Sequence, residues 1–449
     1  MTQRHVPYSV RRAYLVWAAA TAAYIVAVVQ RTSLGVSGLE ALERFGASAA
    51  VLSLFTVTQL VVYSAAQIPV GMALDRFGPR NLIGVGALMM AVGQFGMAFA
   101  PSVELAIVAR VLIGAGDATT FVSVLKIITA WFPPKRAPLL GQISGQIAQT
   151  GQILSAVPFV IVLHHLEWSA AFTILGFLGV LSALVVFTWV RDRPSDFATT
   201  IGAAGAKSGA RAVDMVPSQP QFSPFMGALK ASGSWLGFWS HMVTGFSFNV
   251  FVFLWGYPFL LLGQNLTQAQ ASLLFTWLTL TAMMAGPLIG MFCARHPLRR
   301  SWLVLAVTAG VILAWLLVLL PTTPRPMWVL FIFVSLLGVG GPASLIGLDY
   351  ARTSNPAERF GVASGLSNMG SFVGGFICIL AIGVVLDRVR PDGAYTLADF
   401  RVAFSIMIVP MLVSLIFVII TRRGTRAEFA ERGIRIQPVT QVWRDRHKP

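Results

Sequence analysis

The sequence predicts an all-α polytopic membrane protein with twelve transmembrane helices in two pseudo-symmetric six-helix bundles. Composition indicates the class, because 56% of the 449 residues are hydrophobic and only 11% are charged, whereas soluble proteins carry about 25% charged residues. Apolar runs such as residues 301–320 indicate the helices, since about 20 apolar residues cross a hydrocarbon core roughly 30 Å thick. One central hydrophilic stretch separates six such runs from six more, which indicates two bundles.

The twelve segments are too long and too apolar for the alternating strands of an outer-membrane barrel. The first is about twice as long as the apolar core of a signal peptide, so we expect it to be retained in the protein. The expected spans are residues 13–36, 47–74, 81–100, 104–130, 138–163, 168–190, 232–262, 268–293, 301–320, 326–349, 360–386 and 398–421.

The basic residues indicate how the chain is oriented. With the N-terminus placed in the cytoplasm, most of the 33 Lys and Arg residues fall in cytoplasmic segments, as the positive-inside rule requires. The net charge of +16 therefore follows from membrane orientation, and we expect no nucleic-acid partner. We expect a multi-pass protein of the cell membrane with both termini in the cytoplasm.

The chain divides into four expected regions. These are an N-terminal bundle (residues 1–190), a cytoplasmic linker (191–231), a C-terminal bundle (232–421) and a basic cytoplasmic tail (422–449). The linker is rich in Ala, Gly, Ser and Pro, which is typical of a flexible chain. The halves share an element, GMALDRFGPR at residues 71–80 and GMFCARHPLR at residues 290–299, which indicates a duplicated six-helix unit. We expect a monomer.

The first copy of this element carries charges at a helix end. Gly71 permits close approach of another helix, and Asp75 is followed by Arg76, with Arg80 one turn further on. A carboxylate there can accept from a neighbouring helix N-terminus or pair with an Arg, and so latch two helices reversibly. The alternative is an ordinary charged cytoplasmic loop.

These residues resemble the signature loop of the major facilitator superfamily. The pattern G-x-x-x-D-R-x-G-x-R is matched at Gly71, Asp75, Arg76, Gly78 and Arg80. The pattern R-x-x-x-G-x-G at residues 110–116, WFPPKRA at 131–137 and RDRP at 191–194 are similar to the family as well. The resemblance implies two bundles around a central cavity that opens to each side in turn. Ala294 replaces the acid in the second copy, which implies a latch there that is weaker or differently built.

Arg31 and Asp117 are charged residues inside apolar spans. Such residues cost about 2.5–3.5 kcal/mol on insertion scales and usually face a cavity and a partner. Asp117 shares a helix face with Arg110 and Gly114. A guanidinium can bind a carboxylate or phosphate, and an intramembrane acid can carry a proton. The alternatives are that Arg31 reaches water at the end of its span, or that Asp117 forms a structural ion pair with Arg31 or Arg110.

The first span also resembles the anion–cation symporter branch of the superfamily. QRTSLGV at residues 30–36 is similar to the D-R-x-x-L-x-x-A region of that branch, and Asp117 stands where the branch carries an acid. The resemblance implies that Arg31 binds an organic anion. From the residues themselves we expect Asp117, together with Arg110, to couple protons. Gln30 replaces the acid that often precedes the Arg, which implies a different proton stoichiometry or a less charged substrate.

Polar residues of three other spans are further candidates for solute contact. Exposed amides are unfavourable in lipid, so the Gln side chains of the fifth span are expected to point inward. There they bind solute or form hydrogen bonds to neighbouring helices. Asn368 lies among glycines of the eleventh span that also suit tight packing. The complete set of predicted substrate contacts is Arg31, Gln146, Gln149, Trp255, Tyr257 and Asn368.

Together these features predict a secondary transporter that imports a small organic anion with protons. An acid in an aromatic-lined cavity also suits cations, so proton-driven export of drug-like or metabolite solutes is the alternative, and a receptor that does not transport is a third. The sequence holds no Walker loop, zinc motif or nucleophile elbow, so we expect no enzyme activity, cofactor or metal. The expected partners are a solute, protons and the lipid bilayer.

Overall fold

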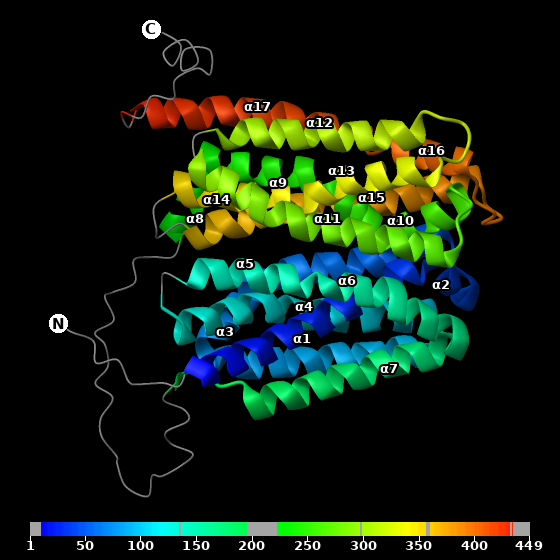
Figure 1. Cartoon of the computed structure of the whole chain (residues 1–449), viewed down its shortest axis with the longest axis horizontal. Helices are drawn as coiled ribbons and strands as arrows, with labels where there is room; N and C mark the ends of the chain where they lie inside the picture. The colour runs from blue at the N-terminus through cyan, green and yellow to red at the C-terminus, as the bar shows by residue number, and fades with distance from the viewer. Residues whose placement is uncertain are drawn as a thin grey trace, which may run out of the picture.

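The computed structural model describes residues 10–133, 136–194, 222–296, 299–355 and 360–431, and Gly433. Nearly all of these residues are helical, and the described ranges contain no β-strand. Figure 1 shows the helices packed side by side in two groups, α1 to α7 in one and α8 to α17 in the other. The predicted class, an all-α membrane protein of two six-helix bundles, is confirmed.

The first group follows the chain from residue 10 to residue 189. Its helix α3 is broken at Gly78, whose φ of 77° is not helical, and α7 is broken at Glu167, whose φ is 62°. The elements are α1 (Val10–Val36), α2 (Gly38–Phe45), α3 (Ala49–Phe99), α4 (Val103–Trp131), α5 (Ala137–Ala148), α6 (Thr150–Leu154), the π-helix η1 (Ser155–Phe159) and α7 (Val160–Trp189).

Length and hydropathy pick out 11 candidate spans among the described residues. One of them, Ile143–Trp189, has 47 residues. As one straight helix it would measure about 70 Å, more than twice the thickness of a hydrocarbon core. The break at Glu167 divides it into two membrane crossings, which gives the twelve spans of the predicted fold.

The second group begins with a short helix and repeats the pattern of long spans. Its first span, Ser232–Gly263, is the most deeply buried of all the candidates and includes two π-helices on either side of Pro258. The elements are α8 (Phe222–Lys230), α9 (Ser232–Val250), η3 (Phe251–Trp255), α10 (Gly256–Pro258), η4 (Phe259–Gly263), α11 (Gln268–Arg295), α12 (Arg300–Leu319), α13 (Met327–Ser344), α14 (Ile346–Ser354), α15 (Phe360–Val389), α16 (Leu397–Ser405) and α17 (Ile408–Glu431).

Two helices extend into regions that the sequence analysis expected to be linker or tail. Helix α8 forms in the last part of the expected linker, where fully buried Ala228 packs with Ala351 and Ala363. Helix α17 continues past residue 421, and Glu428 accepts a hydrogen bond from the backbone amide of Ser232 at the start of α9 (3.0 Å). Tertiary contacts therefore order both segments. Most of the expected linker and the end of the tail lie outside the described residues.

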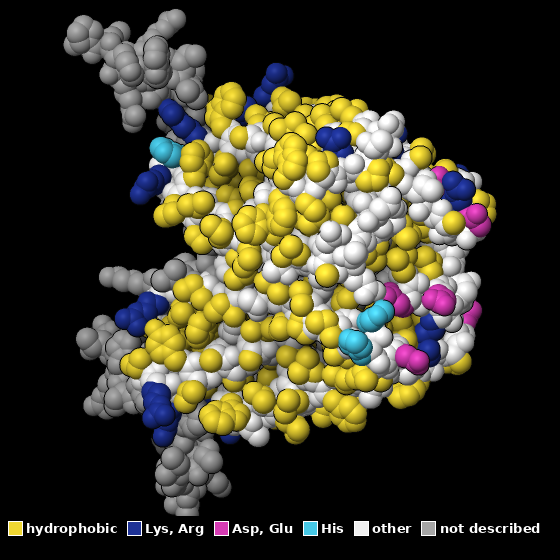
Figure 2. Space-filling model, turned by 45° about the vertical axis from the view of Figure 1, so that its right-hand side comes forward, with side chains coloured by type: hydrophobic (Ala, Val, Ile, Leu, Met, Phe, Trp, Pro, Cys, Tyr) yellow, Lys and Arg dark blue, Asp and Glu magenta, His cyan; other side chains and the backbone are white. Residues whose placement is uncertain are grey.

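Charge is distributed unevenly between the two ends of the molecule. We call the end that holds α2 and α16 the α2 end, and the opposite end, where α5 begins, the α5 end (Figure 1). Lys and Arg gather at the α5 end, whereas Asp and Glu gather at the α2 end (Figure 2). This arrangement matches the charge bias along the sequence, in which the α2 end is the expected outer side.

The two groups meet along several helices. Helix α3 packs on α15, α1 packs on η3, and α11 packs on α6 and η1. Near the α2 end, the hydroxyl of Ser53 on α3 donates to the carbonyl of Ile379 on α15 (2.9 Å). The candidate site lies further along α3, at Tyr63, where residues of both groups meet.

Candidate functional site

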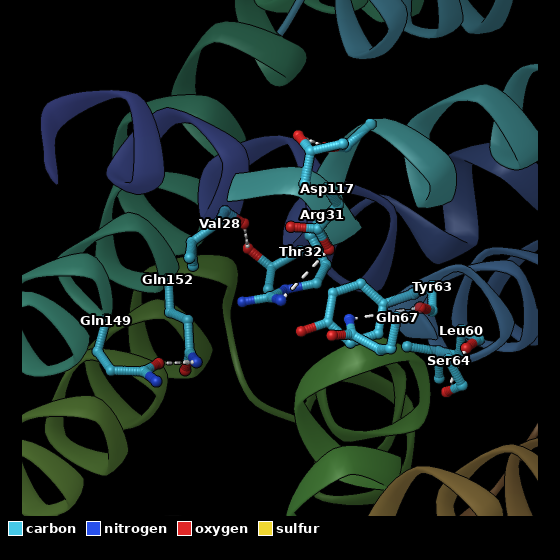
Figure 3. A network of polar contacts seen from close by, with 12 residues as sticks. Val28, Arg31, Thr32, Leu60, Tyr63, Ser64, Gln67, Asp117, Gln149 and Gln152 are labelled. Carbon is cyan, nitrogen blue, oxygen red and sulfur yellow. Dashed lines mark hydrogen bonds and ion pairs between the residues drawn. The ribbon is translucent and has the colours of Figure 1, made fainter. Parts of the chain in front are cut away.

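Arg31 and Asp117 form an ion pair inside the membrane-spanning part of the first group. Nη1 of Arg31 on α1 lies 3.3 Å from Oδ2 of Asp117 on α4. The two side chains are only 10% and 1% exposed. Figure 3 shows them pointing toward one another. Arg31 therefore does not reach water at the end of its span, and of the two partners considered for Asp117 the structure pairs it with Arg31.

The ion pair leaves hydrogen-bonding capacity unused. Nε of Arg31 and Oδ1 of Asp117 are both buried and have no hydrogen-bond partner among the described residues. Buried polar atoms usually find a partner, and those that do not often mark a functional site or a missing ligand. A free donor on the cation and a free acceptor on the acid are what an anion and a proton would use.

Aromatic rings from both groups flank the guanidinium of Arg31. Its Cζ lies 6.0 Å from the ring centre of Tyr63 on α3 and 6.0 Å from that of Phe253 on η3. Tyr63 in turn lies 5.3 Å from Phe372 on α15, between ring centres. The second group thus supplies two of the three rings, so the site is shared by both halves of the molecule.

Arg110 is buried but does not pair with Asp117. It is 1% exposed, and its Nε and Nη1 have no hydrogen-bond partner among the described residues. It lies two turns from Asp117 on α4, and Gly114 and Asp117 are buried on the same helix. A role of Arg110 in proton coupling remains a prediction.

The amides of the fifth span face the second group. Gln149 accepts a hydrogen bond from Gln152, and Thr279 on α11 donates to Gln152 (3.5 Å). Gln146 packs against Gly286, which lies on α11 like Thr279. Figure 3 shows Gln149 and Gln152 at a distance from Arg31, on the far side of Thr32. These amides therefore link the two halves, whatever further contact they make with a solute.

The other predicted contacts have different surroundings. The indole Nε1 of Trp255 donates to the carbonyl of Ile379 (3.0 Å), and the ring is fully buried. The hydroxyl of Tyr257 lies 3.2 Å from that of Ser272 on α11. Asn368 is half-buried on α15. The structure thus gathers Tyr63, Phe253 and Phe372 near Arg31, and it turns the polar atoms of Trp255 and Tyr257 to helices of their own group.

The predicted gating motif is described only in part. Gly71 and Asp75 lie in α3, but their side-chain surroundings are outside the described residues. Arg76 is exposed and lies over the ring of Phe77 (5.2 Å). Gly78 adopts a φ of 77°, a conformation that L-residues with a side chain rarely adopt. This turn breaks α3 between its two spans.

Arg80 ties the motif to the end of α7. Its backbone amide donates to Oδ1 of Asp192 (2.7 Å), and its Nη2 donates to the carbonyl of Phe187 (2.6 Å). Asp192 belongs to the RDRP segment that follows the sixth span. The described part of the motif therefore joins two helices of the first group to each other at the α5 end.

A protein-family model agrees with this architecture across nearly the whole chain. The model for the Major Facilitator Superfamily matches residues 19–257 and again residues 237–449. Among solved structures, a bacterial homologue of the human lysosomal transporter Spinster, in an inward-facing and unoccupied conformation, superposes with a TM-score of 0.70. That comparison covers 96% of this chain and 100% of the other at 17% sequence identity, so it bears on the fold alone.

Several curated transporters are similar to parts of the chain. A probable sulfoacetate transporter of Cupriavidus necator is 24% identical over 60% of this chain and 61% of its own length. A probable L-galactonate transporter of Escherichia coli is 28% identical over 42% of this chain and 41% of its own. A quinolone resistance transporter of Acinetobacter baumannii is 26% identical over 38% and 40%. Each match spans less than two thirds of the relative.

Proposed function

The chain belongs to the Major Facilitator Superfamily and is a membrane transporter, and from this premise we propose that it carries a small organic anion together with a proton by alternating access. The observation that carries the proposal is the buried pair of Arg31 and Asp117, which are 3.3 Å apart. In this cycle Arg31 binds the anion and Asp117 binds the proton. Import is the proposed direction.

Charge balance links the two events. When Asp117 takes up a proton it becomes neutral, and Arg31 is left as an uncompensated cation. Such a cation costs about 2.5–3.5 kcal/mol inside a membrane on insertion scales, and an anion that replaces the carboxylate removes that cost. Proton and anion together leave the net charge of the site unchanged, so the fully loaded and empty states are both favourable and the half-loaded states are not.

The relatives support the same class of solute. Sulfoacetate and L-galactonate, which the names of two relatives contain, are both small organic anions. A sulfonate or carboxylate matches the donors of a guanidinium, which can form two parallel hydrogen bonds to two oxygens. Arg31 retains an unused Nε for this purpose.

Transport into proteoliposomes tests the proposal. Uptake of labelled organic anions should rise when the outside is acidified, and Arg31→Ala should abolish it. Asp117→Asn mimics the protonated acid, so it should retain exchange of anion for anion but lose acceleration by a pH gradient. Arg388→Ala is the matched control, because Arg388 is an exposed Arg in the last turn of α15. Normal proton-driven uptake by Arg31→Ala would refute the proposal.

Proton-driven export is the second candidate. It is favoured by the similarity to the quinolone resistance transporter and by an acid, Asp117, that lies close to aromatic rings. On that alternative a hydrophobic cation replaces Arg31 as the partner of Asp117. Thermal stabilisation of the purified protein by hydrophobic cations and by no organic anion, with loss of the effect in Asp117→Asn, would favour a cation bound at Asp117 over an organic anion bound at Arg31.

A further inference from the structure

The surroundings of Arg31 are aromatic on several sides. Besides Tyr63 and Phe253, whose ring centres lie 6.0 Å from its Cζ, Tyr24 on α1 lies close to the guanidinium. Tyr24 packs against Phe121 of α4 in a tilted arrangement (5.4 Å between ring centres), and Tyr63 contacts Phe372 (5.3 Å). Phe121 and Phe372 are both only partly buried. Rings on α1, α3 and η3 thus lie around one fixed cation, and rings on α4 and α15 pack against two of them.

Several polar side chains of the same region, apart from the ion pair itself, already bond to the protein. Thr32 donates to the carbonyl of Val28 (2.8 Å) and shares a hydrogen bond with Ser155 (2.8 Å). Gln67 lies near the backbone of Tyr63, as Figure 3 shows (3.4 Å).

Amides on neighbouring helices are engaged as well. The Nε2 of Gln30 donates to the carbonyl of Leu175 (3.0 Å), while its buried Oε1 has no partner among the described residues, and Asn249 donates to the hydroxyl of Ser371 (3.2 Å). Gln149 and Gln152 bond to each other. Besides the ion pair, a solute bound at Arg31 would meet few free donors or acceptors on these helices, among them Gln30 Oε1 and Gln59 Nε2.

These surroundings favour some classes of organic anion over others. A polyhydroxylated acid loses the hydration of each hydroxyl when it enters such a site, and every unpaired hydroxyl is then costly. A flat apolar body loses little hydration and gains contact with aromatic rings. One fixed cation balances one negative charge, whereas a second would remain uncompensated in a medium of low dielectric constant.

We propose that the anion bound at Arg31 is a monocarboxylate or monosulfonate with a flat apolar body, which packs against Tyr63 and Phe372. This inference rests on the proposed function, because it assumes that Arg31 binds the anion. It departs from a sugar acid, the class to which L-galactonate belongs. Phe372, on the second half of the molecule, becomes a determinant of specificity.

Binding to the purified full-length protein tests the inference, with the thermal unfolding midpoint as readout over a range of concentrations. The probes are benzoate and phenylacetate for flat anions, gluconate and galacturonate for polyhydroxylated anions, and benzamide as an uncharged ring. We expect benzoate or phenylacetate to bind about tenfold more tightly than gluconate, and benzamide not to bind. Phe372→Leu should bring the two anion classes close to equal affinity, and Phe372→Tyr, which keeps the ring, should preserve the preference.

The outcomes distinguish a failure of the aromatic preference from a failure of anion binding at Arg31. Tighter binding of gluconate or galacturonate that is lost in Arg31→Ala overturns the aromatic preference and leaves anion binding at Arg31 intact. Equal affinities in the wild-type protein overturn the preference without any variant, so the test does not depend on the folding of Phe372→Leu. Anion binding that persists in Arg31→Ala overturns the proposed function and the inference together.

Discussion

Asp387 on α15 caps the N-terminus of α3, which begins at Ala49 in the other half of the molecule. Its Oδ1 accepts a hydrogen bond from the backbone amide of Ala49 (2.7 Å), and its Oδ2 accepts one from that of Ala50 (2.9 Å). The first amides of a helix have no partner within the helix and carry partial positive charge, so a carboxylate there is stabilising. This clasp holds the two halves together at the α2 end.

Asp387→Ala should shift the protein toward a state that is open at the α2 end. Loss of a helix cap costs about 1 kcal/mol, which is a roughly fivefold change in the ratio of closed to open molecules. Spin labels at Glu43→Cys and Asp392→Cys, both exposed positions at this end, report the change as a population of longer distances. Arg388→Ala, one residue away and exposed, should leave the distances unchanged. An unaltered distribution in Asp387→Ala would show that the clasp does not control this end.

Gly383→Ala should open the same end by a different route. A Cβ at this position would lie 2.6 Å from the carbonyl oxygen of Ala49 and 2.9 Å from its carbonyl carbon, so α3 and α15 would have to separate. Gly365→Ala on the same helix is the control, because nothing lies within 4 Å of its added Cβ. We expect longer distances between the labels at Glu43 and Asp392 for Gly383→Ala alone. Equal distances in both variants would contradict the close packing of α3 on α15.

For the same physical reason, the sequence allowed the fold class to be predicted and Arg31 and Asp117 to be singled out, with an ion pair of Asp117 as one alternative. Apolar spans are long and continuous, so a charge within one is conspicuous, and Arg31 and Asp117 could be identified without any knowledge of helix packing. A charge in lipid needs a partner, which restricted the pairing to a few residues. The structure selects Arg31 over Arg110 as the partner of Asp117.

The rest of the site could not be read from the sequence because it depends on how the two halves meet. Tyr63, Phe253 and Phe372 are aromatic residues in apolar spans, like many others in this chain, and only the packing of α3, η3 and α15 brings them together. Asp387 falls one residue beyond the expected end of the eleventh span, where it is indistinguishable from an ordinary loop acid. Conversely, Trp255 and Tyr257 were conspicuous as polar aromatic residues, but their polar atoms bond to α15 and α11.

The two members of the ion pair should respond differently to removal of the partner. Asp117→Asn leaves the guanidinium of Arg31 buried and unable to lose its proton, so the free energy of unfolding should fall by about 3 kcal/mol. Arg31→Gln leaves Asp117, which can take up a proton and become neutral. Its loss of stability should therefore be small at acidic pH and grow as the pH rises.

Unfolding midpoints in detergent at several pH values measure this asymmetry. The double variant should be more stable than the two single losses predict, because neither charge is left uncompensated. Arg388→Gln removes an exposed Arg and should show no such pH dependence. Additive losses in the double variant would mean that the pair contributes nothing as a pair.

Asp192 should stabilise the turn at Gly78 through its acceptor oxygen. The backbone amide of Arg80 donates to Oδ1 of Asp192 (2.7 Å), and an unpaired amide there costs about 1 kcal/mol or more. Asp192→Ala should lower the free energy of unfolding by about that amount, and Asp192→Asn, which keeps one acceptor oxygen, should lower it less. Asp392→Ala removes an acceptor from an exposed loop, where Asp392 bonds to the amide of Ala394 (3.2 Å), and should cost little because water replaces the bond. If Asp192→Asn is as unstable as Asp192→Ala, the negative charge of Asp192 holds the turn, and the hydrogen bond to Arg80 does not.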